Sequence, residues 1–311
     1  ISERYPKVAG RLGMRGIEVA DPYIERLMEG FAFLTSRVQM KMDAEFPRFS
    51  QRMLEMIAPN YLAPTPSMAI AEIQPDSSRG DLSKGFIVPR GTMMDSLALK
   101  KTGVTCSYTT AHEVNLLPLK IERIELGGVP ADLPLAQLGL SQRGISSALR
   151  IRIACDGPQH LGHLDFDRLE FFLSGPDIEA LKLLELVMEH HAGIVCQTVS
   201  KQPQRQLLSS DALRQEGFDA DQALLPDDLR NFDGYRLLQE YFAFPARFRF
   251  ISLSGLGKLI QRCEDEKAFD IFILLDKSDD QLERVVDASH MALHCTPVIN
   301  LFQIGRASCR E

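Results

Sequence analysis

The sequence lacks a long apolar run. A membrane-spanning helix needs about 20 consecutive apolar residues, whereas the best run here, Ile271–Leu275, is closed by Asp270 on one side and Asp276 on the other. We therefore predict no direct membrane insertion. With 311 residues, 45% of them hydrophobic and 25% charged, the chain has the composition of a soluble globular protein of about two domains.

The sequence is also short of basic residues. It has 35 Lys and Arg against 42 Asp and Glu, which gives a net charge of −7. Proteins that follow the phosphates of DNA or RNA need a basic surface. This charge balance therefore excludes nucleic acid as an expected partner.

Closely spaced cysteines are absent. The six cysteines form no C-x-x-C and no short repeat, which is typical of reduced thiols in the cytoplasm. Zinc needs three or four converging ligands. Two clusters come nearest, each one strong ligand short: Cys155 with His160 and His163, and Cys295 with His290 and His294. We predict satisfied or solvated histidines rather than a metal site.

Catalytic and cofactor motifs are missing as well. The segment Gly255-Leu256-Gly257-Lys258 does not have the spacing of a phosphate-binding loop, and we interpret it as a turn. The glycines between Gly10 and Gly16 do not match the dinucleotide fingerprint. Ser254 does not stand in a nucleophile elbow. We therefore predict no catalytic residue and no cofactor.

The N-terminal region, residues 1–62, has a helical pattern. Asp21-Pro22 offers a cap followed by proline at the first helical position. Apolar residues then recur every three or four positions: Ile24, Leu27, Met28, Phe31, Leu34, Val38 and Met42. Because Pro47 should interrupt a helix, we predict two helices with a bend, Pro22–Ala44 and Pro47–Ala58.

Residues 63–204 show a different pattern. Pro59, Pro64 and Pro66 favour an extended linker, because the residue before a proline avoids the helical region. Short runs with period two follow, separated by glycines, so we predict a β-rich domain resembling a sandwich or barrel, with one helix near Ile178–Met188. The expected strands are Met68–Ile73, Val104–Tyr108, Lys120–Leu126, Leu149–Ala154, Leu169–Leu173 and Ile194–Ser200.

Residues 205–303 predict a mixed α/β domain. Its expected helix lies near Leu229–Phe242, and its expected strands are Phe248–Leu253, Ala268–Leu275 and Met291–His294. Aromatic residues are 7% of the chain, yet they gather in this helix and the strand after it. Together the three regions predict the fold class α+β, with N-terminal helices, a β-rich domain and a mixed domain.

The chain ends predict a fragment. Ile1 is not a methionine, and residues 2–6 look like the tail of a helix whose beginning is absent. Residues 304–311 follow an apolar segment abruptly, and they resemble the translation of a short-read sequencing adapter. We expect the natural sequence to stop at Gln303, and we exclude Cys309 from chemical arguments.

Several blocks of the sequence resemble one known family in the same order. They are Glu3–Leu12, Val19–Tyr23, Leu27–Leu34, Asp43–Phe49, Pro59–Met68, Gly234–Pro245 and Cys295–Phe302. These blocks resemble TssF, also called VasA or ImpG, a baseplate subunit of the type VI secretion system. The resemblance covers Ile1–Gln303 and implies that about half of the subunit lies outside this chain.

The resemblance implies a structural subunit that is not an enzyme, with a fold like that of phage baseplate wedge proteins. Two copies would join one TssG in a wedge, and wedges would assemble with TssK and TssE around the VgrG hub region beneath the contractile sheath. The resemblance also implies a bacterial, cytoplasmic location, with the baseplate docked at the inner-membrane complex.

Two segments are candidate partner interfaces, Tyr23–Met42 and Leu229–Phe244, because obligate interfaces are extensive and rich in aromatic residues. The candidate contact residues are Tyr23, Phe31, Met40, Met42, Phe232, Tyr235, Tyr241, Phe242 and Phe244. Periodic apolar stripes usually pack within their own domain. We therefore expect core residues to outnumber contact residues in these segments, and we expect the methionines from Met28 to Met56 to belong to a core.

Two other functions stay open from the residues alone. One is a cytoplasmic hydrolase or metalloenzyme that uses one of the Cys/His clusters. The other is a β-sandwich module on Ser67–Gln204 that binds a carbohydrate or a peptide.

Overall fold

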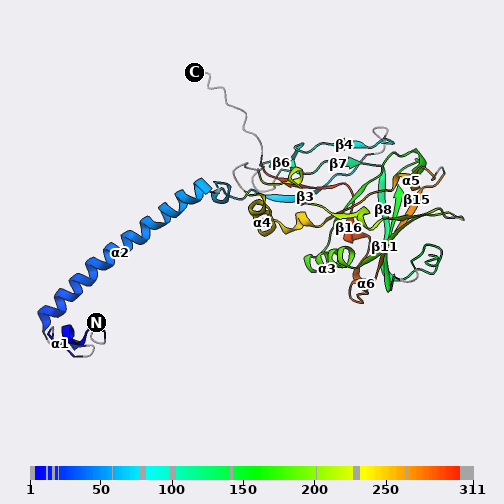
Figure 1. The fold of residues 1–311 in the computed structure, drawn as a ribbon. Coiled ribbons are helices and arrows are strands. Elements are labelled where there is room, and N and C mark those ends of the chain that lie inside the picture. The colour runs from blue at the N-terminus through cyan, green and yellow to red at the C-terminus, as the bar shows by residue number, and fades with distance from the viewer. Residues whose placement is uncertain are drawn as a thin grey trace, which may run out of the picture. The chain divides into compact units, whose positions relative to one another are not determined.

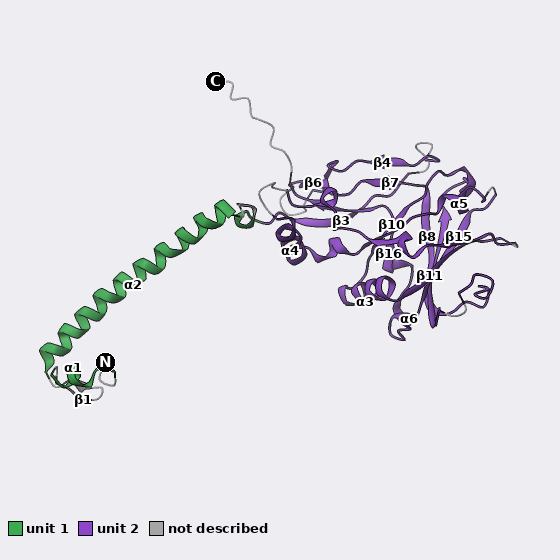
Figure 2. Ribbon diagram, viewed as in Figure 1, with its two compact units in different colours: residues 1–64 green, residues 65–311 purple. Residues whose placement is uncertain are grey.

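The computed structural model divides the chain into two units, Ile1–Pro64 (unit 1) and Thr65–Glu311 (unit 2) (Figure 2). The structure describes residues 4–11, 13–15, 18–19, 21–57, 59–76, 82–98, 103–140, 143–200, 202–226, 232–263 and 265–301. The predicted adapter-like tail, residues 304–311, lies outside the described residues.

Unit 1 is built around one long helix. A short helix α1 (Pro6–Arg11) and a two-stranded ladder of β1 (Met14–Arg15) and β2 (Glu18–Val19) come before α2 (Pro22–Ile57), and a 3₁₀ turn, η1 (Pro59–Leu62), follows it. Asp21 starts α2 as predicted, since its Oδ1 accepts a hydrogen bond of 2.9 Å from the Tyr23 amide.

The prediction of two helices separated at Pro47 is wrong. α2 is a single helix of 36 residues that contains Pro47 (Figure 1). A proline inside a helix leaves the carbonyl four residues earlier without its amide donor. At 100° per residue, Pro47 lies on the side of α2 opposite Phe31, Val38 and Phe49. The carbonyl of Asp43 therefore loses its partner on the more polar side of the helix, where water can replace it.

The largest sheet of unit 2 has five antiparallel strands. Their order is β12 (Arg205–Leu208), β11 (His191–Thr198), β15 (Ala268–Leu275), β9 (Ser147–Cys155) and β8 (Leu119–Gly128). In β9 the side chains alternate between the two faces: Leu149, Ile151 and Ile153 are buried, while Arg150 and Arg152 are half-buried. This alternation gives the sheet one face that belongs to the main core and a second face that carries polar residues beside a smaller apolar cluster, which includes Val195, Phe272 and Leu274.

Smaller antiparallel sheets complete unit 2. One has the order β13 (Leu213–Gln215), β14 (Phe250–Leu253), β10 (Leu169–Leu173) and β16 (Met291–Ala292). Another has the order β3 (Met68–Glu72), β17 (Cys295–Ile299), β6 (Ser107–Thr110) and β5 (Met93–Asp95), and β4 (Phe86–Val88) pairs with β7 (Val114–Leu116). The helices are α3 (Asp177–Glu189), α4 (Asp233–Ala243), α5 (Gly257–Ile260) and α6 (Leu282–Val285).

The main core of unit 2 joins the five-stranded sheet, the sheet that contains β10 and β14, and helix α3. Its fully buried members include Ile151 of β9, Ile271 of β15, Leu173 of β10 and Leu183 of α3. Burying one such side chain stabilises a fold by about 1.5–3 kcal/mol. Helices and antiparallel sheets therefore pack together in one core, which confirms the predicted α+β class.

The predicted boundary at residues 204 and 205 falls inside unit 2. The strands on its two sides pair directly, with Ile194 of β11 opposite Leu208 of β12. β15, from the predicted third region, lies between β11 and β9 from the second. The period-two signal marks each strand but does not say which strands pair, so the sequence separated residues that share one sheet.

Candidate protein-interaction surfaces

Helix α2 carries a continuous apolar face. Ten apolar residues recur at steps of three or four: Ile24, Leu27, Phe31, Leu34, Val38, Met42, Phe46, Phe49, Met53 and Met56. At 100° per residue they fall within an arc of about 120°, and we call them the α2 stripe. At 1.5 Å per residue the 36-residue helix is about 54 Å long.

The α2 stripe is not part of a core, which corrects the sequence-based expectation. Within residues 22–57 no side chain is buried, and Tyr23 and Phe31 are 87% and 73% exposed. Met40, Met42 and the other methionines of α2 are exposed or half-buried as well. A stripe that packs on its own domain and one that packs on a partner have the same period, so the sequence could not distinguish them.

Helix α4 has its polar side inward. Its buried residues are Arg236 and Glu240, and Glu240 is 0% exposed. The Glu240 carboxylate accepts hydrogen bonds from the amides of Leu224 and Leu225, at 3.1 and 2.8 Å. It also forms ion pairs with Arg236 and with the fully buried Arg247. These charged contacts fix how the helix is rotated on unit 2.

The outer side of α4 is apolar. We call its exposed residues the α4 face: Phe232, Tyr235, Leu238, Tyr241 and Phe242. Phe242 is 81% exposed, and the rings of Phe232 and Tyr235 meet edge to face at 5.9 Å. The predicted contact residue Phe244 differs, because it is half-buried against a small apolar cluster that contains Leu224 and Ile299.

Thus eight of the nine candidate contact residues are exposed, four of them on α2 and four on or beside α4. Helix α4 contradicts the expectation that its apolar residues form a core, since its buried side chains are charged. One sequence signal could have revealed this inversion. Arg236 and Glu240 are spaced by four, so they share a helix side that the surrounding aromatic residues do not occupy.

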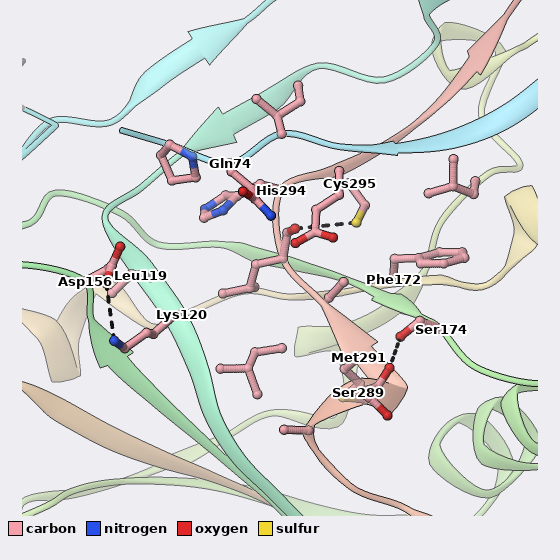
Figure 3. A pocket seen from close by; sticks show the side chains of 18 residues that line it. Gln74, Leu119, Lys120, Asp156, Phe172, Ser174, Ser289, Met291, His294 and Cys295 are labelled. Atoms are coloured by element: carbon pink, nitrogen blue, oxygen red, sulfur yellow. Dashed lines mark hydrogen bonds and ion pairs between the residues drawn. The ribbon is translucent and has the colours of Figure 1, made fainter. Parts of the chain in front are cut away.

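A cavity of about 690 Å³ lies between strands β3, β8 and β16 (Figure 3). His294 and Cys295 line it, together with an ion pair of 3.3 Å between Lys120 and Asp156 at its edge. Burial lowers the pKa of His294 to about 4 and raises the pKa of Cys295 to about 12. At neutral pH the imidazole is therefore uncharged and the thiol is protonated, which makes this pair a poor nucleophile and base.

His294 is held by structural contacts. Its Nε2 accepts a hydrogen bond of 3.2 Å from the Leu117 amide, and its backbone has a φ of 56°. His290 has different partners from His294. Its two ring nitrogens contact the carboxylates of Glu179 and Asp287 at 3.2 and 3.1 Å. These contacts join the turn before β16 to helix α3.

The Cys155 cluster has no metal-site geometry. The rings of His160 and His163 meet edge to face at 6.1 Å, and Nδ1 of His160 contacts the carbonyl oxygen of Asp265 at 2.9 Å. Burial raises the pKa of the Cys155 thiol to about 11. Across the described part of the chain, no three His, Cys, Asp or Glu side chains converge as metal ligands would.

The glycine-rich segment Gly255-Leu256-Gly257-Lys258, which was predicted to be a turn, is a loop at its first two residues and the start of α5 at its last two. Its amides already have an anionic partner, since the carboxylate of Asp167 accepts hydrogen bonds from Gly255 at 3.1 Å and from Gly257 at 2.8 Å. Leu256 is buried in the main core. The segment follows β14 in the chain, and its hydrogen bonds to Asp167 hold it against the loop before β10.

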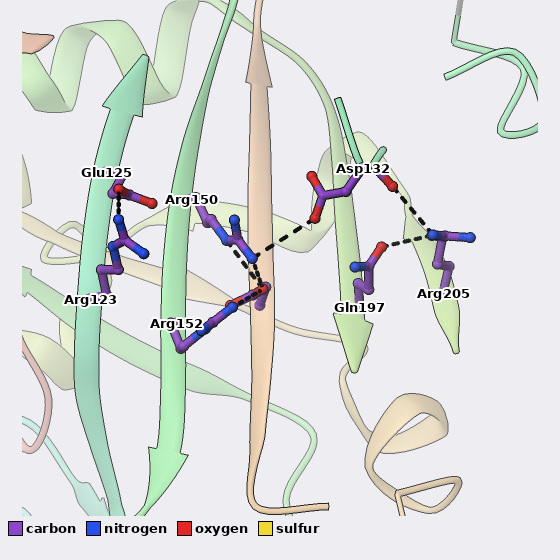
Figure 4. Close-up of polar contacts among 8 residues, drawn as sticks. Arg123, Glu125, Asp132, Arg150, Arg152, Gln197 and Arg205 are labelled. Carbon is purple, nitrogen blue, oxygen red and sulfur yellow. Dashed lines mark hydrogen bonds and ion pairs between the residues drawn. The ribbon is translucent and has the colours of Figure 1, made fainter. Parts of the chain in front are cut away.

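A polar cluster crosses the outer face of the five-stranded sheet (Figure 4). Asp270 of β15 is 1% exposed and accepts hydrogen bonds from Arg150 and Arg152 of β9 at 2.5–3.2 Å. Burial alone would raise the pKa of Asp270, but the hydrogen bonds from Arg152 and Arg150 outweigh it and hold this pKa below its usual range. The cluster stabilises the pairing of β9 with β15.

No helix in the described part of the chain is long and apolar enough to cross a bilayer. The molecule presents two apolar surfaces on helices, the α2 stripe and the α4 face, and a cavity in which burial keeps His294 and Cys295 neutral beside the ion pair of Lys120 and Asp156. Exposed apolar surfaces of this extent are typical of sites that bind other proteins.

Known proteins resemble this chain in sequence and structure. The family model for TssF of the type VI secretion system matches residues 1–306. Component TssF1 of the type VI secretion system of Pseudomonas aeruginosa is 42% identical over 304 residues, which cover 97% of this chain and 48% of that protein. A chain in the cryo-electron microscopy structure of the TssK-TssF-TssG baseplate subcomplex superposes with a TM-score of 0.69 and 26% identity, over 89% of this chain and 49% of that chain.

The chain therefore spans about half the length of the relatives that it matches. The family match and the identity to TssF1 extend over nearly all of its residues. On this evidence the chain belongs to the TssF family of the type VI secretion system.

Proposed function

We propose that this chain is part of a structural subunit of the type VI secretion baseplate, and that it works by binding other subunits and not as an enzyme. Membership of the TssF family and the likeness to a chain of the TssK-TssF-TssG subcomplex support the proposal. The observation that carries it is the α2 stripe, because a contiguous exposed apolar surface of this length marks a site that binds another protein surface.

The spacing of the α2 stripe suits helical partners. Steps of three and four are those by which side chains of one helix fit between side chains of another. The opposite side of α2 also has exposed apolar residues, Phe33 and Met40. A helix with apolar residues on both sides fits a bundle with two neighbours, and we assign these to TssG and a second copy of this chain. Tyr23, Phe31 and Met42 then contact partner helices.

The same proposal extends to the α4 face, where Phe232, Tyr235, Tyr241 and Phe242 are exposed on unit 2. We propose that this face is also covered in the working subunit, with Phe244 holding the end of the helix against unit 2.

The wider assignment follows from the family. TssK is a component of the subcomplex that the related chain belongs to. We further propose contacts of the complete subunit with TssE and the VgrG hub region, support of sheath assembly, and a cytoplasmic baseplate docked at the inner-membrane complex. These partners would use other surfaces, including those of the half that lies outside this chain.

Co-purification with TssG tests the proposal through a matched pair of variants in the complete protein. Met42→Asp places a carboxylate in the middle of the α2 stripe, whereas Ser50→Asp places one on the flank of α2, between the stripe and the side that carries Phe33 and Met40. Burying an unpaired carboxylate costs several kcal/mol, so we expect Met42→Asp to weaken binding about 100-fold or more. Ser50→Asp should change it by less than about threefold. Equal binding by both variants and the wild type would refute the assignment of α2.

A third variant, Met40→Asp, tests whether α2 has one neighbouring helix or two in the complex. If both sides of α2 are covered, this variant also loses binding or loses the second copy from the complex. Thermal melting of each variant provides the folding control, since none of the three side chains is buried in this chain.

A further inference from the structure

The α4 face combines exposure with a fixed orientation. Its five residues, Phe232, Tyr235, Leu238, Tyr241 and Phe242, are all large and all exposed. The helix cannot rotate them inward without taking Glu240 away from Arg236, from Arg247 and from the amides of residues 224 and 225. The aromatic side chains therefore stay outward for as long as unit 2 is folded.

The chemistry of the α4 face suits permanent cover. Asp233 is the one charged residue among the exposed side chains of residues 232–243. Surfaces that exchange partners have a polar rim and an average polarity, whereas permanently covered surfaces are more apolar and resemble a domain core. A face with so little charge is best covered by a surface that is present from synthesis onward.

The chain leaves the described part of unit 2 next to α4. Leu301 packs against the apolar cluster of Ala111, Leu224, Leu225 and Ile299, and Phe244 at the end of α4 packs against the same cluster. The carbonyl oxygen of Leu301 accepts a hydrogen bond of 3.0 Å from Thr109. Any chain that continues beyond residue 301 therefore starts beside the end of α4.

The relatives carry as many residues again as those that match. The matched segment is 48% of TssF1 and 49% of the chain in the baseplate subcomplex. We propose that the complete polypeptide continues beyond residue 301 and that this continuation covers the α4 face, packing an apolar surface of its own on these five side chains. This inference rests on the proposed function, which states that the α4 face is covered in the working subunit.

Nitration of tyrosines by tetranitromethane tests the proposal without any substitution. The complete protein is treated alone, and the modification rates of Tyr235, Tyr241 and Tyr23 are read by mass spectrometry. Each rate is compared with that of the same tyrosine in the protein unfolded in guanidinium chloride. All three tyrosines are exposed in this chain. We expect Tyr235 and Tyr241 to react at least tenfold more slowly in the folded complete protein, while Tyr23 stays reactive.

Reaction of Tyr235 and Tyr241 at the rate of the unfolded protein would overturn the inference. The inference fails even if adding TssG and TssK then protects these tyrosines, because the cover would then be another subunit. Tyr23 lies beside the α2 stripe at the start of α2. Its protection on adding TssG therefore reports on partner binding by α2, and so on the proposed function. Failure of the one proposal can thus be told apart from failure of the other.

Discussion

Replacing Asp270 by Asn should weaken unit 2 without changing its shape. Asp270 lies on β15, almost fully buried, and accepts four charge-assisted hydrogen bonds from Arg150 and Arg152 of β9. Asparagine has nearly the same size but no charge, and its amide nitrogen cannot accept. The substitution therefore removes the Asp270 carboxylate from Arg152 and leaves Arg150 with the more distant carboxylate of Asp132, at 4.0 Å, on a surface that is mostly covered.

The magnitude follows from how buried the three side chains are. Removing one partner of a buried ion pair costs about 3–5 kcal/mol. The side chains of Arg150 and Arg152 are 22% and 23% exposed, so water compensates part of the loss, and we expect a decrease of about 2–4 kcal/mol in the free energy of unfolding. For a unit of this size that corresponds to a fall in melting temperature of roughly 5–15 °C.

Thermal melting at several pH values measures the effect. The pKa of Asp270 is lowered in the folded protein, so its stabilising contribution is present above the pKa of an unfolded aspartate, about 3.9. It is lost as the pH falls through the lower, folded value. The difference in melting temperature between wild type and Asp270→Asn should be constant from pH 7 to about 5 and shrink below about pH 4.

A neighbouring ion pair provides the matched control. Glu125 pairs with Arg123 on β8, on the same sheet, but both side chains are largely exposed. Glu125→Gln should change the free energy of unfolding by less than about 1 kcal/mol. If Asp270→Asn melts within about 1 °C of the wild type at pH 7, or no further from it than Glu125→Gln does, the reasoning about the buried cluster is refuted.

Three further predictions concern other parts of the chain. Glu240→Gln should lower the free energy of unfolding of unit 2 by about 3–5 kcal/mol, because it leaves two buried arginines without their carboxylate; an unchanged thermal melt would contradict this. Pro47→Ala should slow hydrogen exchange in α2, since an interior proline costs about 3 kcal/mol, and unaltered exchange would count against a continuous helix. Native protein at pH 8 should be labelled by a thiol reagent at half-buried Cys106 well before Cys196, whose pKa burial raises; equal labelling would show that Cys196 is accessible.

Strands with strong local patterns could be predicted from the sequence. The predicted Leu169–Leu173 and Ala268–Leu275 coincide with β10 and β15. Both are apolar or alternating runs bounded by polar residues, and both are buried by neighbours on each side. In such strands the local signal and the tertiary environment agree.

Strands that depend on distant partners could not be predicted. β17, Cys295–Ile299, contains Pro297, which argues against a strand from sequence alone. Its pairing with β3 and with the end of β6 joins residues that lie far apart in the chain, such as Val298 and Thr110. Strands as short as β13 and β16 do not show a period.

The candidate surfaces divide in the same way. The period of the α2 stripe could be read from the sequence, but its exposure could not, because it depends on what else the chain places against the helix. For α4 the opposite sides of the helix were readable from the spacing of Arg236 and Glu240. Which side faces inward is decided by contacts outside the helix, with Arg247 in the turn that follows it and with the amides of residues 224 and 225 before it.

The exposed area of the α2 stripe in an assembled complex is the most direct test of this chain's role. We expect a structure of the complete protein bound to TssG to show Phe31, Val38, Met42 and Phe49 packed between partner side chains, with most of their present exposure lost. If these four side chains remain as exposed in that complex as they are in this chain, α2 is not a partner-binding helix and the proposed structural role fails.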